Sequence, residues 1–219
     1  MSFWPKPQFG LEDWSLDASS RLATGFFQLD QLTLRHRGYK IESLGPMQRE
    51  LILRDPAMVV ILVDPTIQAV VLVEQFRVGA AMSQLKKSPW MLEWVAGICD
   101  EGENPAETCR REVFEETGLV LTEKPTLLYT YCPSPGGSNE LIYLFVATCD
   151  SSRAASFRGQ TGEFEDLKVH VIPISDALDA LVTGQVNNAA TIIGLQWLCA
   201  NRSRFEEGGE LAKKSTTRT

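Results

Sequence analysis

The chain has 219 residues, of which 44% are hydrophobic and 22% are charged. This is enough for one globular domain with a sizeable core and a small accessory element. Its net charge of −7 lacks the basic excess expected of a protein that binds nucleic acid or an anionic membrane surface. We therefore expect neither nucleic acid nor a membrane among its partners, and polyanionic substrates must be met by local arginines and metal.

Cysteine usage and hydropathy bear on the compartment. The five cysteines are odd in number and show neither zinc-ligand spacing nor a C-x-x-C pair, which favours a reducing cytoplasm. No apolar run reaches transmembrane length, and the start, MSFWPKPQFGLEDW, lacks the charged-then-apolar order of a secretion signal. We expect a cytoplasmic globular protein.

The first quarter of the chain predicts an accessory unit. Residues 1–20 carry two tryptophans and two prolines without a period, so we expect an arm packed on the surface. The runs FFQLDQLTLRHR and MQRELILR follow, separated by the glycine- and proline-containing GYKIESLGP. They predict a small antiparallel β unit over residues 25–54.

The remainder predicts strands mixed with a few helices. Strand-like runs occur at 58–64, 69–77, ahead of Gly97, and at 127–132, 141–149 and 168–174. Near the C-terminus, ISDALDALVTG predicts a helix with Ser175 as cap and Gly184 as stop, and NNAATIIGLQWLCANR a helix capped by Asn187 or Asn188. Helices on both faces of the strands give an α/β or α+β sandwich. The final FEEGGELAKKSTTRT predicts a frayed tail.

A further helix follows Gly97. Asn104 suits an N-cap, Pro105 the first helical position and Glu107 the third residue of a capping box, and Gly118 suits the left-handed residue that ends a helix. This helix carries several acidic side chains.

Three of these acidic side chains share one face of the helix. Glu112, Glu115 and Glu116 stand at i, i+3 and i+4, so their like charges repel one another. A hard cation such as Mg²⁺ or Mn²⁺, which prefers oxygen ligands, removes the conflict. A solvated acidic face is the alternative, and for an isolated E-x-x-E-E it is the commoner one.

The sequence from Gly97 to Leu119 favours the metal site over the solvated acidic face. It resembles the Nudix box, G-x5-E-x7-R-E-U-x-E-E-x-G-U with U a bulky apolar residue, at every specified position: Gly97, Glu103, Arg111, Glu112, Val113, Glu115, Glu116, Gly118 and Leu119. The resemblance implies the Nudix fold, a mixed β-sheet sandwiched between helices. It also implies three regions: an N-terminal arm and small β unit for dimerisation and base binding (1–55), a catalytic domain (56–205) and a flexible tail (206–219).

The substrate must be read from outside the box. Pro135, in YCPSPGGSNE, lies sixteen residues beyond Leu119, and in this proline the chain resembles ADP-ribose pyrophosphatases. Nudix enzymes acting on dinucleoside polyphosphates carry a tyrosine about eighteen residues on, where this chain has Gly137. EQFR (74–77) and the course of residues 162–198 are also similar to the bacterial ADP-ribose pyrophosphatases, so the resemblance extends from Gly25 to Leu198.

The resemblance implies a substrate site that includes an arginine clamp on the diphosphate and an aromatic–arginine pocket for the base. Its residues are Phe26, Phe27, Arg49, Glu50, Arg54, Arg77, Ile98, Ser134, Pro135, Gly136 and Glu140. Alternatives remain for each part: S-P-G-G is a common turn, Arg77 could be a surface residue, and aromatic and guanidinium groups are frequent at dimer interfaces. The chain also departs from the family at ILRDP, where a phenylalanine-containing segment ending in Arg-Gly is more usual.

The resemblance also implies the catalytic groups. Glu112, Glu116, the Ala96 carbonyl and Glu165 would hold the metal, with Glu115 a further ligand or an orienting group. Arg111 would pair with a box carboxylate and fix its rotamer. Glu163 would be the general base, although E-F-E-D could also be a solvated loop.

The expected function is hydrolysis of ADP-ribose to AMP and ribose 5-phosphate with Mg²⁺ or Mn²⁺. The resemblance further implies a homodimer whose N-terminal unit contributes to the partner's site. Two alternatives remain: a hydrolase of another nucleoside diphosphate sugar such as GDP-mannose, and a non-catalytic Nudix ligand sensor. The sensor is disfavoured because such domains usually lose box carboxylates, and all of them are present here.

Overall fold

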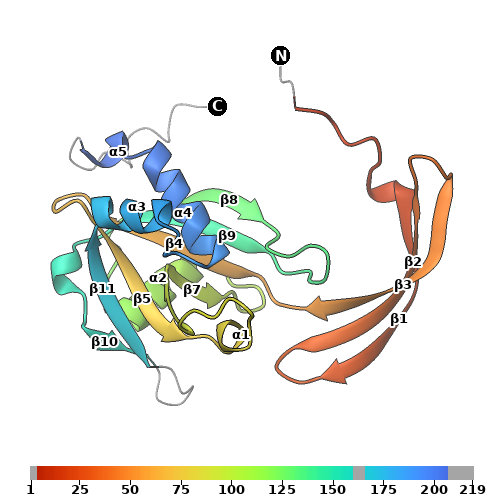
Figure 1. The fold of residues 1–219 in the computed structure, drawn as a ribbon, viewed down its shortest axis with the longest axis horizontal. Coiled ribbons are helices and arrows are strands. Elements are labelled where there is room, and N and C mark those ends of the chain that lie inside the picture. Colours follow the sequence, from red (N-terminus) through yellow and green to blue (C-terminus); the bar gives the residue numbers. More distant parts are fainter. Residues whose placement is uncertain (1–3, 160–165, 207–219) are drawn as a thin grey trace. The chain divides into compact units, whose positions relative to one another are not determined.

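The computed structural model describes residues 4–159 and 166–206. These fall into two compact units (Figure 1). The first contains the chain up to Arg54 together with Ser134–Glu140, and the second contains Asp55–Pro133 and the chain from Leu141 onward. The tail predicted over 206–219 lies outside the described residues from position 207 on.

The first unit is built on a three-stranded antiparallel sheet of order β1-β2-β3. A 3₁₀ turn η1 (Leu11–Asp13) leads into β1 (Trp14–Thr24), which is followed by β2 (Gln28–Arg37) and β3 (Ser43–Leu53). The arm predicted over residues 1–20 is therefore wrong from Trp14 on. Pairing with β2 along the length of β1 overrides the weak strand signal of WSLDASSRLAT, since strand formation depends on context more than on propensity. All of β1 is exposed.

Ser134–Glu140 joins this unit although it is distant in sequence. The Ile52 amide donates to the Gly137 carbonyl (2.9 Å), and the Asn139 amide donates to the Ile52 carbonyl (3.3 Å). The S-P-G-G segment itself is a turn, in which the Gly137 and Ser138 amides donate to the Ser134 carbonyl (3.2 and 3.0 Å). The proline-containing segment is thus held by backbone bonds to β3.

The second unit is built on a mixed sheet. Its main path runs β10-β11-β5-β4-β9-β8, and β6 pairs with β5 while β7 pairs with β4. The strands are β4 (Ala57–Asp64), β5 (Ala69–Phe76), β6 (Trp90–Glu93), β7 (Val95–Ile98), β8 (Thr126–Tyr131), β9 (Ile142–Thr148), β10 (Phe157–Arg158) and β11 (Leu167–Pro173). β4 and β9 are parallel, whereas the other pairs are antiparallel. The predicted mixed sheet is confirmed.

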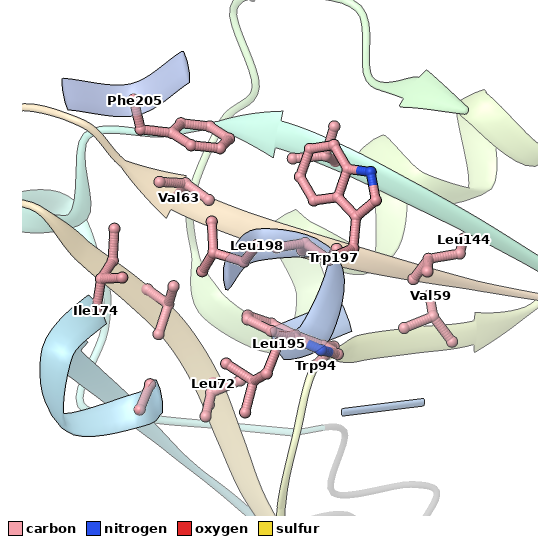
Figure 2. Close-up of a cluster of buried hydrophobic side chains, with 14 of the residues drawn as sticks. Val59, Val63, Leu72, Trp94, Leu144, Ile174, Leu195, Trp197, Leu198 and Phe205 are labelled. Atoms are coloured by element: carbon pink, nitrogen blue, oxygen red, sulfur yellow. The ribbon is translucent and has the colours of Figure 1, made fainter. Parts of the chain in front are cut away.

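Helices cover both faces of this sheet (Figure 1). The helical elements of the second unit are α1 (Val78–Ala81), α2 (Pro105–Thr117), the 3₁₀ turn η2 (Ser151–Arg153), α3 (Ile174–Val182), α4 (Ala189–Ala200) and α5 (Ser203–Glu206). On one face, α2 packs against Met58, Val60 and Leu62 of β4. On the other, Leu195, Trp197 and other residues of α3, α4 and α5 pack against alternate strand residues (Figure 2). Because helices cover both faces of the sheet, β4 is apolar from Ala57 to Val63.

The predicted ends of the last two long helices are partly right. α3 begins at Ile174, so Ser175 lies inside the helix and Pro173 takes the N-cap position. The buried Ile174 side chain holds this end in place of a side-chain cap. Asn188, and not Asn187, caps α4, because its Oδ1 accepts from the Thr191 amide (2.9 Å). Within the two described stretches, no helix is long and apolar enough to cross a membrane.

Candidate active site

The acidic helix α2 has well-defined ends. Asn104 is its N-cap and accepts from the Ala106 amide (2.9 Å), and Pro105 is the first helical residue. The side-chain cap reaches Ala106 and not Glu107, whose amide donates to the Asn104 carbonyl instead (2.8 Å). Gly118 ends the helix at φ 75°, the left-handed conformation that glycine adopts without a steric penalty. These ends set the rotation at which α2 presents its glutamates.

Arg111 lies between two glutamates of α2, Glu112 and Glu115, and Glu103, which precedes the helix. Its Nη1 donates to Glu112 Oε1 (2.7 Å) and to Glu115 Oε2 (3.2 Å). Its Nε and Nη2 form a two-pronged contact with Glu103 (3.3 and 3.2 Å). These hydrogen bonds lower the pKa of Glu103 and raise the pKa of Arg111 further above its ordinary value. Arg111 therefore neutralises part of the acidic cluster and fixes the direction of each carboxylate.

Gly97, the first residue of the motif, lies against Glu112. A β-carbon at position 97 would overlap the Cγ and Cδ atoms of the Glu112 side chain. Any residue other than glycine would have to push that carboxylate away from β7, the strand that also carries Ala96 and Ile98. The Ile98 carbonyl accepts from Arg111 Nη2 (3.4 Å). The fixed spacing between Gly97 and Glu112 is thus a steric requirement.

Glu116 differs from the other box carboxylates in its burial. It is 5% exposed, and a carboxylate at that depth carries a desolvation penalty that a nearby positive charge offsets. Among the described residues, no three His, Cys, Asp or Glu side chains are arranged to hold a metal ion. One reason is that Glu103, Glu112 and Glu115 are directed at Arg111. Glu163 and Glu165 lie outside the described residues.

Arg77 lies at the end of β5, as the sequence indicated. Its Nε donates to Glu93 Oε2 (2.7 Å), and its side chain is 45% exposed. Glu93 was not among the predicted residues. The strand register places Glu93 opposite Val73, four residues before Arg77, so the contact is made by the two side chains and cannot be read from the local sequence.

The first unit brings together four of its predicted residues. The Arg54 guanidinium lies over the Phe27 ring, 4.7 Å from its centroid, and Arg54 Nε contacts Glu140 Oε1 (3.0 Å). Phe26 packs edge-on against Phe27, with 4.9 Å between ring centroids. The Arg54 amide also donates to Asn139 Oδ1 (2.8 Å), a contact that the sequence reasoning missed.

The remaining predicted residues of the first unit are exposed. Arg49 Nη1 donates to the carbonyl of its neighbour Gln48 (2.8 Å), and Glu50 lies opposite Gln31 on the β2–β3 ladder. Ser134, Pro135 and Gly136 form the exposed part of the turn described above. Their assignment to the substrate site remains a prediction.

One further arginine packs on the acidic helix. Arg158 of β10 lies over the Phe114 ring, 5.8 Å from its centroid. A β-carbon on Gly118 would lie 2.5 Å from Arg158 Nη2, so the guanidinium also packs close to the end of α2. This residue has no motif signal in the sequence because β10 is only two residues long.

Comparison with known proteins identifies the family of this chain. A family model of the NUDIX domain matches residues 53–192. The chain belongs to the Nudix family. The match covers the acidic helix, Arg77 and the segment from Ser134 to Glu140, and it excludes β1 and β2.

Several curated Nudix relatives are similar to this chain over most of its length. ADP-ribose pyrophosphatase of Haemophilus influenzae is 35% identical over 213 residues, which is 94% of this chain and 98% of that protein. ADP-ribose pyrophosphatase of Escherichia coli K12 is 38% identical over 191 residues (87% and 90%). GDP-mannose pyrophosphatase of E. coli SMS-3-5 is 34% identical over 151 residues (69% and 77%).

A solved structure shares the Nudix fold. The crystal structure of an ADP compounds hydrolase superposes with a TM-score of 0.65 at 19% identity, covering 88% of this chain and 98% of the other. The predicted Nudix fold is confirmed.

Nudix hydrolases generally use divalent metal ions, and the residues here fit such an ion. The donors near α2 are carboxylate oxygens, the ligand type that Mg²⁺ and Mn²⁺ prefer. The absence of a side chain at Gly97 keeps room for the Glu112 carboxylate against β7.

Proposed function

We propose that this protein hydrolyses the diphosphate of ADP-ribose to AMP and ribose 5-phosphate with Mg²⁺ or Mn²⁺. One observation carries the proposal: a complete Nudix box that runs from β7 through the capped helix α2, with Arg111 directing Glu103, Glu112 and Glu115. This box stands in a chain that is 35–38% identical to ADP-ribose pyrophosphatases. Intact carboxylates also favour an enzyme over a ligand sensor.

The proposed metal site combines glutamates of the box with two residues outside it, Ala96 and Glu165. Glu112, Glu116 and the Ala96 carbonyl, with Glu165, would hold the metal, and Glu115 would be a further ligand or would orient one. A metal held there supplies charge neutralisation of the phosphate oxygens and lowers the pKa of a bound water. Arg111 keeps Glu112 in one rotamer through its 2.7 Å hydrogen bond.

Three further residues would act on the attacking water or on the substrate. Glu163 remains the proposed general base, which takes the proton of the attacking water. Arg77 would bind the diphosphate, and its Nε hydrogen bond to Glu93 orients the planar fork for two-pronged phosphate binding. We assign Ile98 as a further contact, since it follows Gly97 directly.

The first unit would bind the nucleoside. Phe27 and Arg54 offer an aromatic face and a guanidinium plane, and Glu140 offers a carboxylate oxygen to an exocyclic amino group. An adenine is complementary to that combination. Phe26, Arg49, Glu50 and the Ser134–Gly136 turn are assigned as supporting contacts.

We also propose a cytoplasmic homodimer formed through the first unit. Its three-stranded sheet leaves all of β1 exposed, including Trp14 (51%), Leu16 (49%) and Leu22 (48%). A second copy would cover such an apolar stripe. Size-exclusion chromatography with light scattering tests this, and a monomer at micromolar concentration would contradict it.

The function is tested with purified protein, Mg²⁺ and a substrate panel, with all products resolved. The panel contains ADP-ribose, GDP-mannose, NADH, coenzyme A and diadenosine polyphosphates. We expect ADP-ribose to give the highest kcat/KM. Glu116→Gln serves as the matched control, because it removes one anionic oxygen and should lower the rate by orders of magnitude while raising the Mg²⁺ needed for half-activity.

GDP-mannose hydrolysis is the second candidate, because a GDP-mannose pyrophosphatase is 34% identical over 69% of this chain. A tenfold preference for GDP-mannose, about 1.4 kcal/mol in transition-state binding, would replace the ADP-ribose assignment. Activity on neither sugar nucleotide, with Glu116→Gln indistinguishable from wild type, would overturn both.

A further inference from the structure

A pocket lies in the second unit, on the face of the sheet opposite α2. It has a volume of about 540 Å³ and is bounded by β5, β6, β11, α3 and the start of α4. Leu72, Ile172, Ala177 and Leu195 line it with apolar surface. These residues belong to the cluster that packs α3 and α4 on the sheet, whereas α2 packs on the other face. The pocket is therefore separate from the acidic helix.

Thr191 is a buried polar residue in the lining of this pocket. The residue lines the pocket and is 1% exposed, and within the described part of the chain its Oγ1 atom is buried with no hydrogen-bond partner. Its amide is already engaged by the Asn188 cap (2.9 Å). Buried hydroxyls in native proteins are nearly always hydrogen-bonded. Because Thr191 lines the cavity, this hydroxyl is available as a hydrogen-bonding group for a ligand.

The other polar groups of the pocket select the kind of ligand. Gln185, Asn187 and Asp176 also line the pocket. Gln185 Nε2 donates one hydrogen to Thr183 Oγ1 (2.9 Å), and Asp176 Oδ1 accepts from Ser175 Oγ (3.1 Å), which leaves the second Nε2 hydrogen of Gln185 and Asp176 Oδ2 for a ligand. Each amide carries a donor and an acceptor side by side, which matches the edge of a nitrogen heterocycle. Trp90, also on the lining and 56% exposed, offers an aromatic face for stacking.

The charges of the pocket disfavour an anion. Asp176 and Glu74 are acidic, and Lys87 is the basic group on the lining. Lys87 Nζ donates to the Gly184 carbonyl (2.7 Å), and Glu74 Oε2 is bonded to His170 Nε2 (2.8 Å). A phosphate would therefore meet two carboxylates against one anchored ammonium, whereas an uncharged ligand would not be repelled.

We propose that this pocket is a binding site for an uncharged, planar nitrogen heterocycle of the nucleobase class. The apolar walls would cover the faces of the ring, and Thr191 with the Gln185 and Asn187 amides would bond its edge. The volume is in the range of small-molecule sites, and so is the pattern of apolar walls with a few polar groups. The site is independent of the diphosphate chemistry proposed for α2.

The test is a titration of the full chain, labelled at its methyl groups, with adenine and with cytosine, followed by NMR. Because adenine could also bind Phe27 of the first unit, the experiment is done in a Phe27→Ala background. We expect shifts at the methyl groups of Leu72, Ile172, Ala177 and Leu195. Thr191→Val keeps the shape and removes the hydroxyl, so it should weaken binding about tenfold, the scale of one lost hydrogen bond.

Two further variants make the result decisive. Ala180→Leu should fill the pocket and abolish the shifts, whereas Gln196→Ala, an exposed change on α4, should leave binding unchanged. Thr191→Val should melt no lower than wild type, because it removes an unsatisfied buried group. No shift at millimolar adenine or cytosine, binding unaffected by Thr191→Val and Ala180→Leu, or displacement of adenine by inorganic phosphate would each overturn the proposal.

Discussion

At the residue scale, the acidic helix depends on one arginine and one glycine. Arg111 offsets the repulsion among carboxylates that i, i+3 and i+4 spacing creates. Its side chain is 35% exposed, so the three ion pairs contribute modestly to stability. Their main effect is to orient the three carboxylates, because each accepts at least one hydrogen bond from Arg111.

Gly97→Ala tests the contact between β7 and Glu112. The added methyl group overlaps the Glu112 side chain, so the carboxylate must rotate away. We expect the fold to survive, because position 97 is partly exposed, and kcat on ADP-ribose to fall by about 10²-fold, as a misplacement of about 1 Å can cause. Steady-state kinetics with circular dichroism measure both, and an alanine variant with normal kcat would show that Glu112 can relax harmlessly.

Glu163 and Glu165, which lie outside the described residues, can be told apart by metal rescue. Glu163→Gln should lower kcat by about 10²–10⁴-fold with little change in affinity, the scale for a lost general base. Glu165→Gln should act through the metal, so extra Mn²⁺ should partly restore it. If metal instead rescues Glu163→Gln, or if that variant is fully active, the base must be sought among Glu165, Glu115 and Glu140.

At the scale of elements, α4 approaches the sheet through a glycine. A β-carbon at Gly194 would overlap Nε1 of the buried Trp94 ring and lie 3.1 Å from Ile61 Cγ1. Gly194→Ala gains about 1 kcal/mol in helix propensity, but overpacking a core costs about 1–3 kcal/mol. We expect a net loss in the free energy of unfolding.

Gly79→Ala is the matched control for that substitution. Gly79 lies in α1, and a β-carbon there meets no atom within 4 Å among the described residues. Urea unfolding should show this variant equal to or slightly more stable than wild type. A Gly194→Ala protein that is also more stable would show that Trp94 can move.

A second element-level feature is the anchor of the β4–β5 turn. Asp64 Oδ1 accepts from the Thr66 and Ile67 amides (2.9 and 3.4 Å), and Oδ2 accepts from the Ser151 amide and hydroxyl (2.9 and 2.6 Å). Burial raises the pKa of Asp64, but these hydrogen bonds outweigh it and the net pKa is lowered. The ionised carboxylate therefore ties η2 to the end of β4.

Asp64→Asn should destabilise the protein at neutral pH. Both carboxylate oxygens accept from backbone amides, so in either orientation the asparagine NH₂ would face a donor and leave it unsatisfied, at a cost of about 1–3 kcal/mol. Because the folded pKa lies below the unfolded value of about 3.9, the wild-type advantage is present above that pH. It disappears as pH falls through the folded pKa.

Urea unfolding at pH 7 and at successively lower pH measures this advantage. Asp64→Ala is the comparison variant, because it removes the acceptor without adding a donor. It leaves all four donors without this acceptor, whereas asparagine keeps one acceptor oxygen, so Asp64→Ala should lose more free energy of unfolding than Asp64→Asn. An asparagine variant as stable as wild type at pH 7 would show that the carboxylate does not anchor the turn.

At the scale of the whole molecule, the thiols report on packing across the chain. All five cysteines are free: Cys99 and Cys109 are buried, Cys149 is partly buried, and Cys132 and Cys199 are exposed. Burial raises the pKa of Cys109 and of Cys149 to about 12, which suppresses the reactive thiolate.

Iodoacetamide should therefore modify Cys132 and Cys199 first in the native protein and all five cysteines after denaturation. Mass spectrometry of timed samples measures the order. Early labelling of Cys109, on the buried face of α2, would mean that the acidic helix opens in solution.

A feature could be predicted from the sequence when the residues that form it lie close together along the chain. The ends of α2 and the Arg111 cluster were predictable because their residues lie within sixteen positions of one another, Glu103 to Gly118. The strand β1 was missed because it is defined by pairing with β2 and not by its own pattern. The contact of Glu93 with Arg77 is made by side chains sixteen positions apart on different strands, and that of Ser151 with Asp64 joins residues 87 positions apart.

The parallel pairing of β4 with β9 has a consequence for synthesis. Ala57 lies opposite Ile142, 85 positions later in the chain (142 minus 57). At roughly 5–20 residues per second, one edge of the apolar β4 waits roughly 4–17 s for its neighbour, while β5 and β7 can already occupy the other edge. The nascent chain therefore exposes, for seconds, one unpaired edge of a strand that is apolar from Ala57 to Val63, and this is the interval in which a ribosome-associated chaperone would protect it from aggregation.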